Sequence, residues 1–172
     1  KQIQALLDAT EQLQVTGRNV RLLFAGVGPE VTMVQEASER VSFVEYAGPY
    51  NYVTEYAALQ TRVDLIYALY PQETPNYRTH IARRFHEAVL AGMPIIVTRD
   101  THMGDIVKRS NVGWEVGDTS VTDLVTLLTD LYDNRSLLGK ATADEQMLAR
   151  HRFETYKPAL LQAHTDAVAS RG

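Results

Sequence analysis

The sequence of 172 residues contains no cysteine, which excludes disulfide bonds and thiolate metal sites and favours a reducing compartment. No apolar run approaches the roughly 18 residues of a membrane-spanning helix, and we expect no signal peptide. Positive charge is not in excess, because the formal net charge is -4, whereas a broad nucleic-acid surface needs clustered positive charge. We therefore expect a small-molecule partner and no nucleic acid.

Several common motifs are also missing. The chain has no P-loop, and the turn "AGVGPE" with Gly26 and Gly28 lacks the third glycine and downstream acid of a dinucleotide fingerprint. No Gly-x-Ser-x-Gly elbow supplies a hydrolase nucleophile. The histidines lack metal-ligand spacing, and we interpret Asp100, His102 and Asp105 as a helix start. These absences make NAD or ATP binding of the usual kinds, hydrolase chemistry and a metal site poor predictions.

The chain does contain a regular alternation of apolar runs and helical patterns. Short apolar runs predict strands in "VRLLFAG", "VSFVEYAG", "VDLIYALYP", "PIIVT" and "VGWEV". Helical spacing predicts helices in "KQIQALLDATEQLQ", "VTMVQEASER", "YNYVTEYAALQTR", "ARRFHEAVLAG", "HMGDIVKRS" and "SVTDLVTLLTDLYDN", the last capped by Ser120 or Thr119. This alternation indicates an α/β fold, a Rossmann-like doubly wound parallel sheet flanked by helices.

We expect one domain over residues 1–172. The stretch "QETPNYRTH" is predicted as a polar loop. The tail beyond residue 135 is largely helical in pattern, with a C-terminal helix over residues 150–172. Because the chain begins at Lys1 without a methionine and enters a helical pattern at once, we expect it to be a piece of a longer protein.

Ligands of such folds bind beyond the carboxyl ends of the strands. This rule selects the stretches "AGVGPE", "EYAGPYN", "YPQETPNYRTH" and "TRDTHMGD". The glycines of the first stretch either let a backbone approach a phosphate or make a tight corner between strand and helix. Tyrosines are dense between residues 46 and 70; we interpret most as packing residues, while one could stack on a base.

The helix predicted over residues 82–91 carries the most polar candidates. Arg83 and Glu87 are four residues apart and could simply form an exposed ion pair. Alternatively Arg78, Arg83 and Arg84, with the free N–H groups of a helix start, match a diphosphate. In that arrangement the Glu87 carboxylate would accept hydrogen bonds from a ribose diol.

With these residues in place, the chain resembles the C-terminal, donor-binding half of a GT-B fold retaining glycosyltransferase of the large bacterial "glycosyl transferases group 1" type. "RFHEAVLAGMPIIVT" is the most specific match, to the Glu-Ala-x-x-x-Gly-x-Pro block of that family. "KQIQALLDAT", "VRLLFAGVGPE", "VSFVEYAG" and "NVGWEVGDTSVTDL" are similar to its other stretches. The resemblance implies that the domain's first strand and the N-terminal acceptor domain lie outside this chain.

The resemblance also implies roles for single residues. Arg83 and Arg84 would stabilise the leaving diphosphate, and Thr79 or Glu73 would contact the donor sugar. The donor nucleotide would be bound by Glu87, Lys1, Gly26, Gly28, Tyr46, Ala47 and Arg78. The chain departs from the family where Thr79 replaces the first glutamate of a Glu-x7-Glu pattern and Gln2 replaces the glycine that follows the usual lysine.

The implied activity is retaining transfer from a nucleotide sugar, such as a UDP- or GDP-sugar, to a saccharide or lipid-linked acceptor. No cofactor or metal is expected, and the chain alone would bind nucleotide without turnover. The expected location is cytoplasmic, at the inner face of the membrane if the missing half associates with it. Three alternatives stay open: a nucleotide-sugar epimerase of the same architecture, a non-catalytic GT-B-like binding module, and a flavodoxin-like receiver domain.

Overall fold

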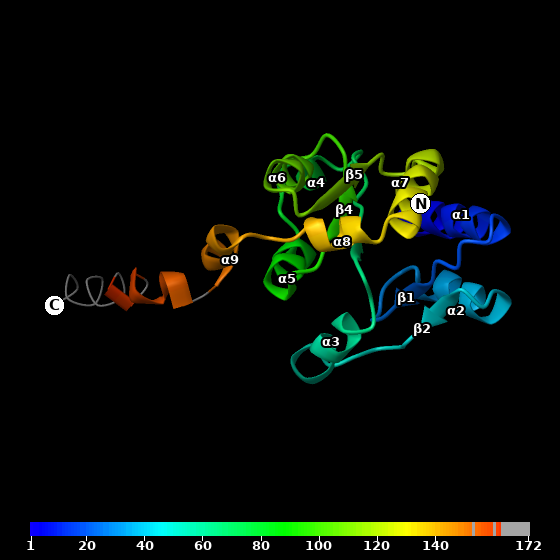
Figure 1. The fold of residues 1–172 in the computed structure, drawn as a ribbon. Helices are drawn as coiled ribbons and strands as arrows, with labels where there is room; N and C mark the ends of the chain where they lie inside the picture. The colour runs from blue at the N-terminus through cyan, green and yellow to red at the C-terminus, as the bar shows by residue number, and fades with distance from the viewer. Residues whose placement is uncertain (153, 160, 163–172) are drawn as a thin grey trace.

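The computed structural model describes residues 1–152, 154–159 and 161–162. Helices and strands alternate along the chain (Figure 1), which confirms the predicted α/β class. Their bounds, in order, are α1 (Gln2–Val15), β1 (Leu22–Phe24), α2 (Val31–Arg40), β2 (Val44–Tyr46), α3 (Tyr52–Gln60), β3 (Ile66–Ala68), α4 (Pro75–Thr79), α5 (Arg83–Ala91), β4 (Ile95–Thr98), α6 (His102–Ser110), β5 (Gly113–Val116), α7 (Val121–Asp133), α8 (Ser136–Lys140) and α9 (Glu145–His151).

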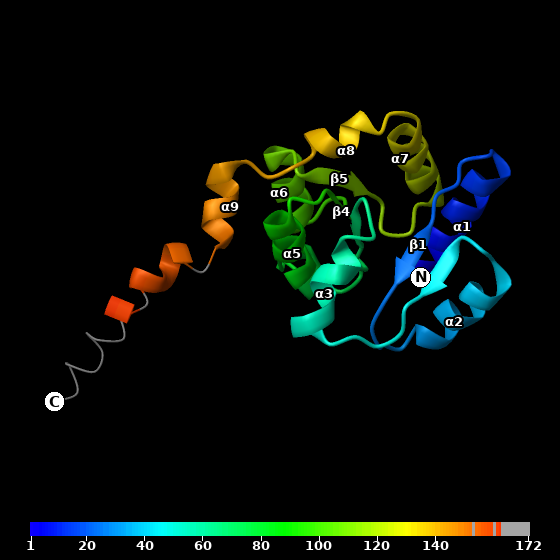
Figure 2. The same cartoon turned by 60° about the horizontal axis from the view of Figure 1, so that its bottom comes forward.

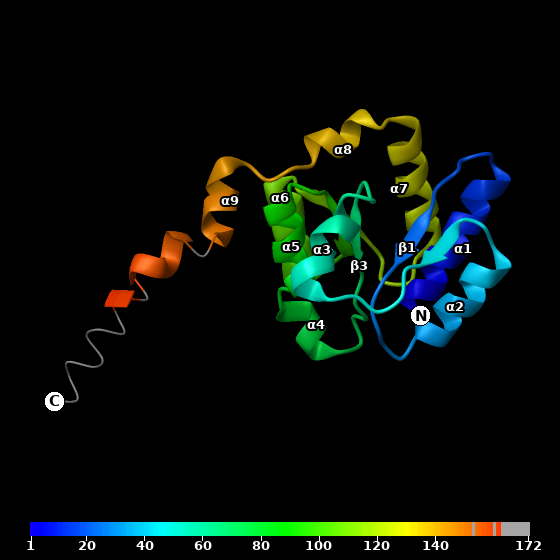
Figure 3. The same cartoon turned by 90° about the horizontal axis from the view of Figure 1, so that it is seen from below.

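The strands form two parallel sheets instead of one. β1 pairs with β2, and β3, β4 and β5 pair in that order. Among the described residues no strand pairing joins β1 to β3, and the two sheets lie side by side in Figures 2 and 3. Every residue of β4 is buried, because helices cover both faces of the three-stranded sheet. Parallel pairing is therefore confirmed, whereas a single continuous sheet is not seen.

The core connects these sheets through α1. On one face of the larger sheet, α5 and α6 contribute buried residues such as Phe85 and Val107. On the other face α1 and α7 pack together, with Leu13 and Leu124 fully buried. A further α1 residue, Leu7, packs with residues of α2 and β2. One helix thus holds the smaller sheet against the larger one.

Capping residues set several helix boundaries. The Ser120 side chain accepts a hydrogen bond from the Asp123 N–H at the start of α7, which confirms the predicted cap there. Thr101 caps α6 in the same way, and His102 is its first residue, so the predicted helix start in that stretch is confirmed. Gly92 ends α5 in the left-handed conformation that favours glycine, with φ 65°.

Two regions depart from the sequence prediction. The predicted loop "QETPNYRTH" contains the short helix α4, which begins with Pro75 at a position where its missing N–H costs nothing. In the tail, α9 ends at His151, and Arg152 has an extended backbone with ψ 130°. After this break, residues 154–159 and 161–162 are helical, which confirms that part of the helix predicted over residues 150–172; residues 153, 160 and 163–172 lie outside the described residues.

No helix of the described part of the chain is long and apolar enough to cross a membrane.

Candidate functional site

The loops that follow β1 and β2 meet at the carboxyl ends of these strands. The Gly26 N–H donates to the Gly48 carbonyl at 2.8 Å, and the Tyr46 hydroxyl donates to the Gly26 carbonyl at 2.8 Å. The Ala47 N–H donates to the Phe24 carbonyl, also at 2.8 Å. Gly26 has a φ of +109°, which side-chain-bearing residues rarely adopt. Three of the predicted residues, Gly26, Tyr46 and Ala47, are thus brought together.

Glu87 is the only acidic residue that is buried in the part of the chain that the structure describes, with 9% of its surface exposed. The Tyr56 hydroxyl donates a hydrogen bond to Glu87 Oε2 at 2.8 Å. Arg83 Nε lies 2.9 Å from Oε1, but without hydrogen-bond geometry, so Oε1 has no hydrogen-bond partner. A buried carboxylate oxygen without a donor is costly, which marks Glu87 as a group available to a ligand.

Three tyrosines of α3 and the loop before it stack together beside Glu87. Tyr56 stacks on Tyr50 with ring centroids 5.9 Å apart and on Tyr52 at 5.0 Å. The Arg83 guanidinium lies over the Tyr52 ring, 4.4 Å from its centroid. We call Tyr50, Tyr52 and Tyr56 the tyrosine stack. It connects the two halves of the site, because a Cβ added to Gly26 would lie 3.5 Å from the Tyr50 ring.

The tyrosine stack is carried by an unusual helix. Asn51 caps α3 by accepting hydrogen bonds from the N–H groups of Val53 and Thr54. Yet no residue of α3 is buried, and the Val53 side chain is 89% exposed. Figures 1 and 3 show α3 at the outside of the molecule, nearest the viewer in Figure 3. Little burial therefore fixes this helix in place.

Two pKa shifts follow from the contact with Glu87. Burial, followed by the hydrogen bond to Glu87, raises the pKa of Tyr56 well above its usual range. Hydrogen bonding with the same carboxylate raises the pKa of Tyr52, although only the Tyr56 hydroxyl has hydrogen-bond geometry in this structure. Both phenols therefore stay protonated at neutral pH, and the Tyr56 hydroxyl donates to Glu87.

The arginines predicted to bind a diphosphate contact other groups. Arg84 Nη1 donates to the Tyr67 carbonyl of β3 at 3.3 Å, and Arg78 Nε donates to the Gln72 carbonyl at 3.0 Å. Arg83 is paired with Glu87, as the simpler interpretation predicted. All three side chains are exposed, so a ligand can compete for them at small cost.

Lys1 and Glu73, predicted to contact phosphate and sugar, pair with each other. Lys1 Nζ lies 2.9 Å from Glu73 Oε1, and both side chains are 69% exposed. The Lys1 amino group lies 3.5 Å from Glu30 Oε1, just after the Gly28 corner, where the Val31 N–H donates to the Gly28 carbonyl. The pairing of the Lys1 side chain with Glu73 raises the pKa of that side chain, chiefly through their hydrogen bond.

Thr79, the last residue of α4, is exposed and forms no hydrogen bond with Glu87. The structure therefore does not bring these two predicted residues into contact. Conversely, the role of Tyr56 was not predicted. A local signal was present, since Asn51 is a good cap and Tyr52 and Tyr56 are four residues apart, on one face of the helix.

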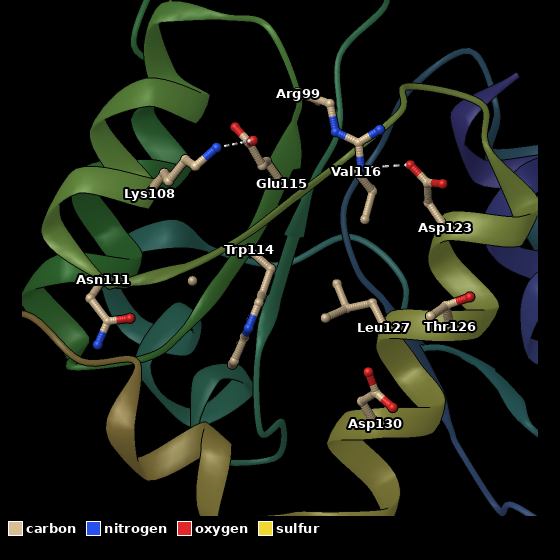
Figure 4. A pocket seen from close by; sticks show the side chains of 11 residues that line it. Arg99, Lys108, Asn111, Trp114, Glu115, Val116, Asp123, Thr126, Leu127 and Asp130 are labelled. Atoms are coloured by element: carbon tan, nitrogen blue, oxygen red, sulfur yellow. Dashed lines mark hydrogen bonds and ion pairs between the residues drawn. The ribbon is translucent and has the colours of Figure 1, made fainter.

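A separate surface groove of about 480 Å³ lies at the edge strand β5, between α6 and α7 (Figure 4). Two ion pairs line it, Lys108 with Glu115 at 3.2 Å and Arg99 with Asp123 at 2.8 Å. None of the residues predicted from the sequence to bind a nucleotide lines this groove. It is therefore distinct from the site around Glu87.

Within the described residues, no group of three or more histidine, aspartate or glutamate side chains is arranged to hold a metal ion. Comparison with models of protein families gave no match, and comparison with curated proteins gave none either.

Proposed function

We propose that this chain is the donor-nucleotide domain of a retaining glycosyltransferase with a GT-B fold. The observation that supports this most is Glu87, a buried carboxylate with one oxygen that has no hydrogen-bond donor. The glycine corner at Gly26 lies beside it through the tyrosine stack. A carboxylate next to backbone corners at the carboxyl ends of parallel strands suits a ribose with an attached diphosphate.

The proposed fold is one doubly wound sheet in the order β2-β1-x-β3-β4-β5, where x is a parallel strand between the two sheets. The Ile66 N–H donates to the Pro94 carbonyl, on the β4 side of β3. The N–H and carbonyl of the next residue, Tyr67, therefore point to the opposite, open edge of β3. At this edge the Arg84 guanidinium donates a hydrogen bond to the Tyr67 carbonyl. Leu22 of β1 and Tyr67 of β3 also pack against the same core cluster, so the two sheets share one core. Both observations support a strand position between the sheets.

In the proposed reaction the ribose hydroxyls of a UDP- or GDP-sugar donate to Glu87, and the diphosphate is held by Arg83, Arg84 and Lys1 with backbone N–H groups. These cations stabilise the negative charge that develops on the leaving diphosphate, the effect expected to dominate at such a site. No protein nucleophile and no metal ion are required. Thr79 or Glu73 would contact the donor sugar.

The saccharide or lipid-linked acceptor would be bound by another domain, in the cytoplasm or at the inner face of the membrane. This chain alone would then bind nucleotide without transferring sugar. Efficient sugar transfer by the isolated chain would contradict this division of roles.

A second candidate is a non-catalytic module of the same architecture. Thr79 favours it, because a threonine stands where the resembling family has a glutamate near the donor sugar. The Lys1–Glu73 pair also favours it, since each residue neutralises a group that the reaction would use.

The test is an amide NMR titration of the chain with UDP, GDP, ADP and CMP, repeated on Glu87→Ala. We expect saturable shifts with one nucleotide, clustered in residues 26–30, 46–50 and 77–87 and weakened in the variant. The absence of shifts with every nucleotide at millimolar concentration would contradict nucleotide binding by this chain. Binding without transfer, even by a chain that includes the acceptor domain, would instead favour the non-catalytic module.

A further inference from the structure

The two oxygens of the Glu87 carboxylate are not equivalent. Oε2 already accepts a hydrogen bond from the Tyr56 hydroxyl at 2.8 Å. Oε1 has no hydrogen-bond donor, although it is buried and Arg83 Nε lies 2.9 Å away. A carboxylate can accept several hydrogen bonds. In this arrangement Glu87 therefore has an unused position on Oε1 and an occupied one on Oε2.

The two neighbours of the carboxylate also differ in how firmly they are held. Tyr56 is partly buried, and its ring stacks with the rings of both Tyr50 and Tyr52. Arg83 is 70% exposed and reaches Glu87 through a long flexible side chain. An exposed arginine rotates away at small cost, whereas a stacked tyrosine must break its aromatic contacts. An incoming hydroxyl therefore displaces Arg83 from Oε1 more easily than it displaces Tyr56 from Oε2.

We infer that Tyr56 is a specificity-determining residue, which keeps Oε2 of Glu87 and leaves Oε1 for a single hydroxyl of the ligand's sugar. This inference rests on the proposed function, since it assigns the sugar specificity of the same nucleotide site. A second, adjacent hydroxyl gains a hydrogen bond to Oε2 only by breaking the bond from Tyr56. Gain and loss are of the same kind and nearly cancel. The chain should therefore distinguish poorly between ribose and 2′-deoxyribose.

The experiment measures the Kd of UDP, GDP and ADP, and then of the 2′-deoxy form of the nucleotide that binds best, for the full chain and two variants. In the unmodified chain we expect the two Kd values to agree within about threefold. In Tyr56→Phe the ring stack stays, but Oε2 loses its donor. Only the ribonucleotide then has a second hydroxyl that can donate a hydrogen bond to the charged Oε2 of Glu87. We therefore expect the ribonucleotide to bind Tyr56→Phe about tenfold more tightly than the deoxynucleotide does.

Tyr50→Phe is the matched control. Tyr50 belongs to the same stack but donates no hydrogen bond to Glu87, so this variant should keep the ratio of the unmodified chain. A ratio above about tenfold in the unmodified chain, or the same ratio in Tyr56→Phe as in the unmodified chain, would overturn the inference. In either case the nucleotide still binds, and the proposed function stands.

A second measurement, made without nucleotide, tests the contact between Tyr56 and Glu87 separately from nucleotide binding. In ¹³C NMR of the tyrosine rings, Glu87→Gln should lower the pKa of Tyr56 in part, because it removes the charge that Tyr56 contacts, while burial, the larger cause of the raised pKa, remains. The pKa of Tyr56 staying unchanged would show that the contact is absent in solution and would overturn the inference. If the pKa falls but no nucleotide binds, the proposed function fails and the specificity role fails with it.

Discussion

Replacement of Glu87 by glutamine tests whether the carboxylate is present for binding or for stability. Glutamine has the same shape and can still accept the hydrogen bond from Tyr56, but it carries no charge. The two roles predict changes of different size in the free energy of unfolding. A structural ion pair that loses one charged partner is strongly destabilised, whereas a buried charge kept for a ligand is costly to the free protein.

The structure gives the magnitude. The hydrogen bond from Tyr56 changes from one to a charged acceptor to one to a neutral acceptor, a loss of about 1 kcal/mol. The pair with Arg83 contributes about 0 to 1 kcal/mol, because the arginine is 70% exposed and screened by water. Relief from burying a charge with an unbonded oxygen offsets these losses by about 1 to 2 kcal/mol. Glu87→Gln should therefore change stability by no more than about 1 kcal/mol.

Urea unfolding followed by circular dichroism and by the fluorescence of the single tryptophan, Trp114 in β5, measures this difference. The same variant should weaken binding of the preferred nucleoside diphosphate by about tenfold or more, because a ribose hydroxyl then meets a neutral acceptor. Glu87→Ala serves as the contrast, since it leaves the Tyr56 hydroxyl without its acceptor and should cost about 1 to 3 kcal/mol. A loss above about 2 kcal/mol in Glu87→Gln, with unchanged nucleotide binding, would refute this reasoning.

Three further predictions concern other parts of the molecule. Partial burial of the ring, followed by the charge of His151, lowers the pKa of His86 below its ordinary 6.5, so the unfolded chain binds this proton more tightly. Stability should fall as the pH drops below 6.5, and the urea midpoint of His86→Gln should depend less on pH between 7.5 and 5.5. Gly26→Ala should cost about 1 to 2 kcal/mol in urea unfolding because its φ is +109°, while Gly28→Ala, with open space and no positive φ, should be nearly neutral. Glu73→Gln removes the partner of Lys1, so titration should show the nucleoside diphosphate binding about threefold more tightly, with an unchanged urea midpoint.

Most of the fold could be predicted because its signals are local. The capped start of α7 at Ser120 and the buried run of β4 depend on neighbouring residues and on hydrophobic periodicity. The helix α4 was missed because it has only five residues and none of them is buried, so its sequence carries no apolar face. The split between the two sheets could not be predicted, since the pairing of distant strands is not encoded in any single segment.

The candidate site was predictable in part for the same reason. Gly26 follows the end of β1, where parallel topology places ligand sites, and Glu87 stands out as a carboxylate on the apolar-patterned helix α5. The contact between Tyr56 and Glu87 joins residues 31 positions apart, and no spacing rule selects one tyrosine among the several in that region. The partners of Lys1 and Arg84 were also unpredictable, because they depend on which acceptors the tertiary fold leaves open.

The position of Arg84 has a physical cause in the open edge of β3. An unpaired strand carbonyl is a strong acceptor that must find a donor, and at Tyr67 the donor is Arg84. A parallel strand on that edge would supply backbone N–H groups to the same carbonyl and release the Arg84 guanidinium. A strand at this edge would thus free a cation for a diphosphate. For this reason we expect sheet completion and nucleotide affinity to rise together.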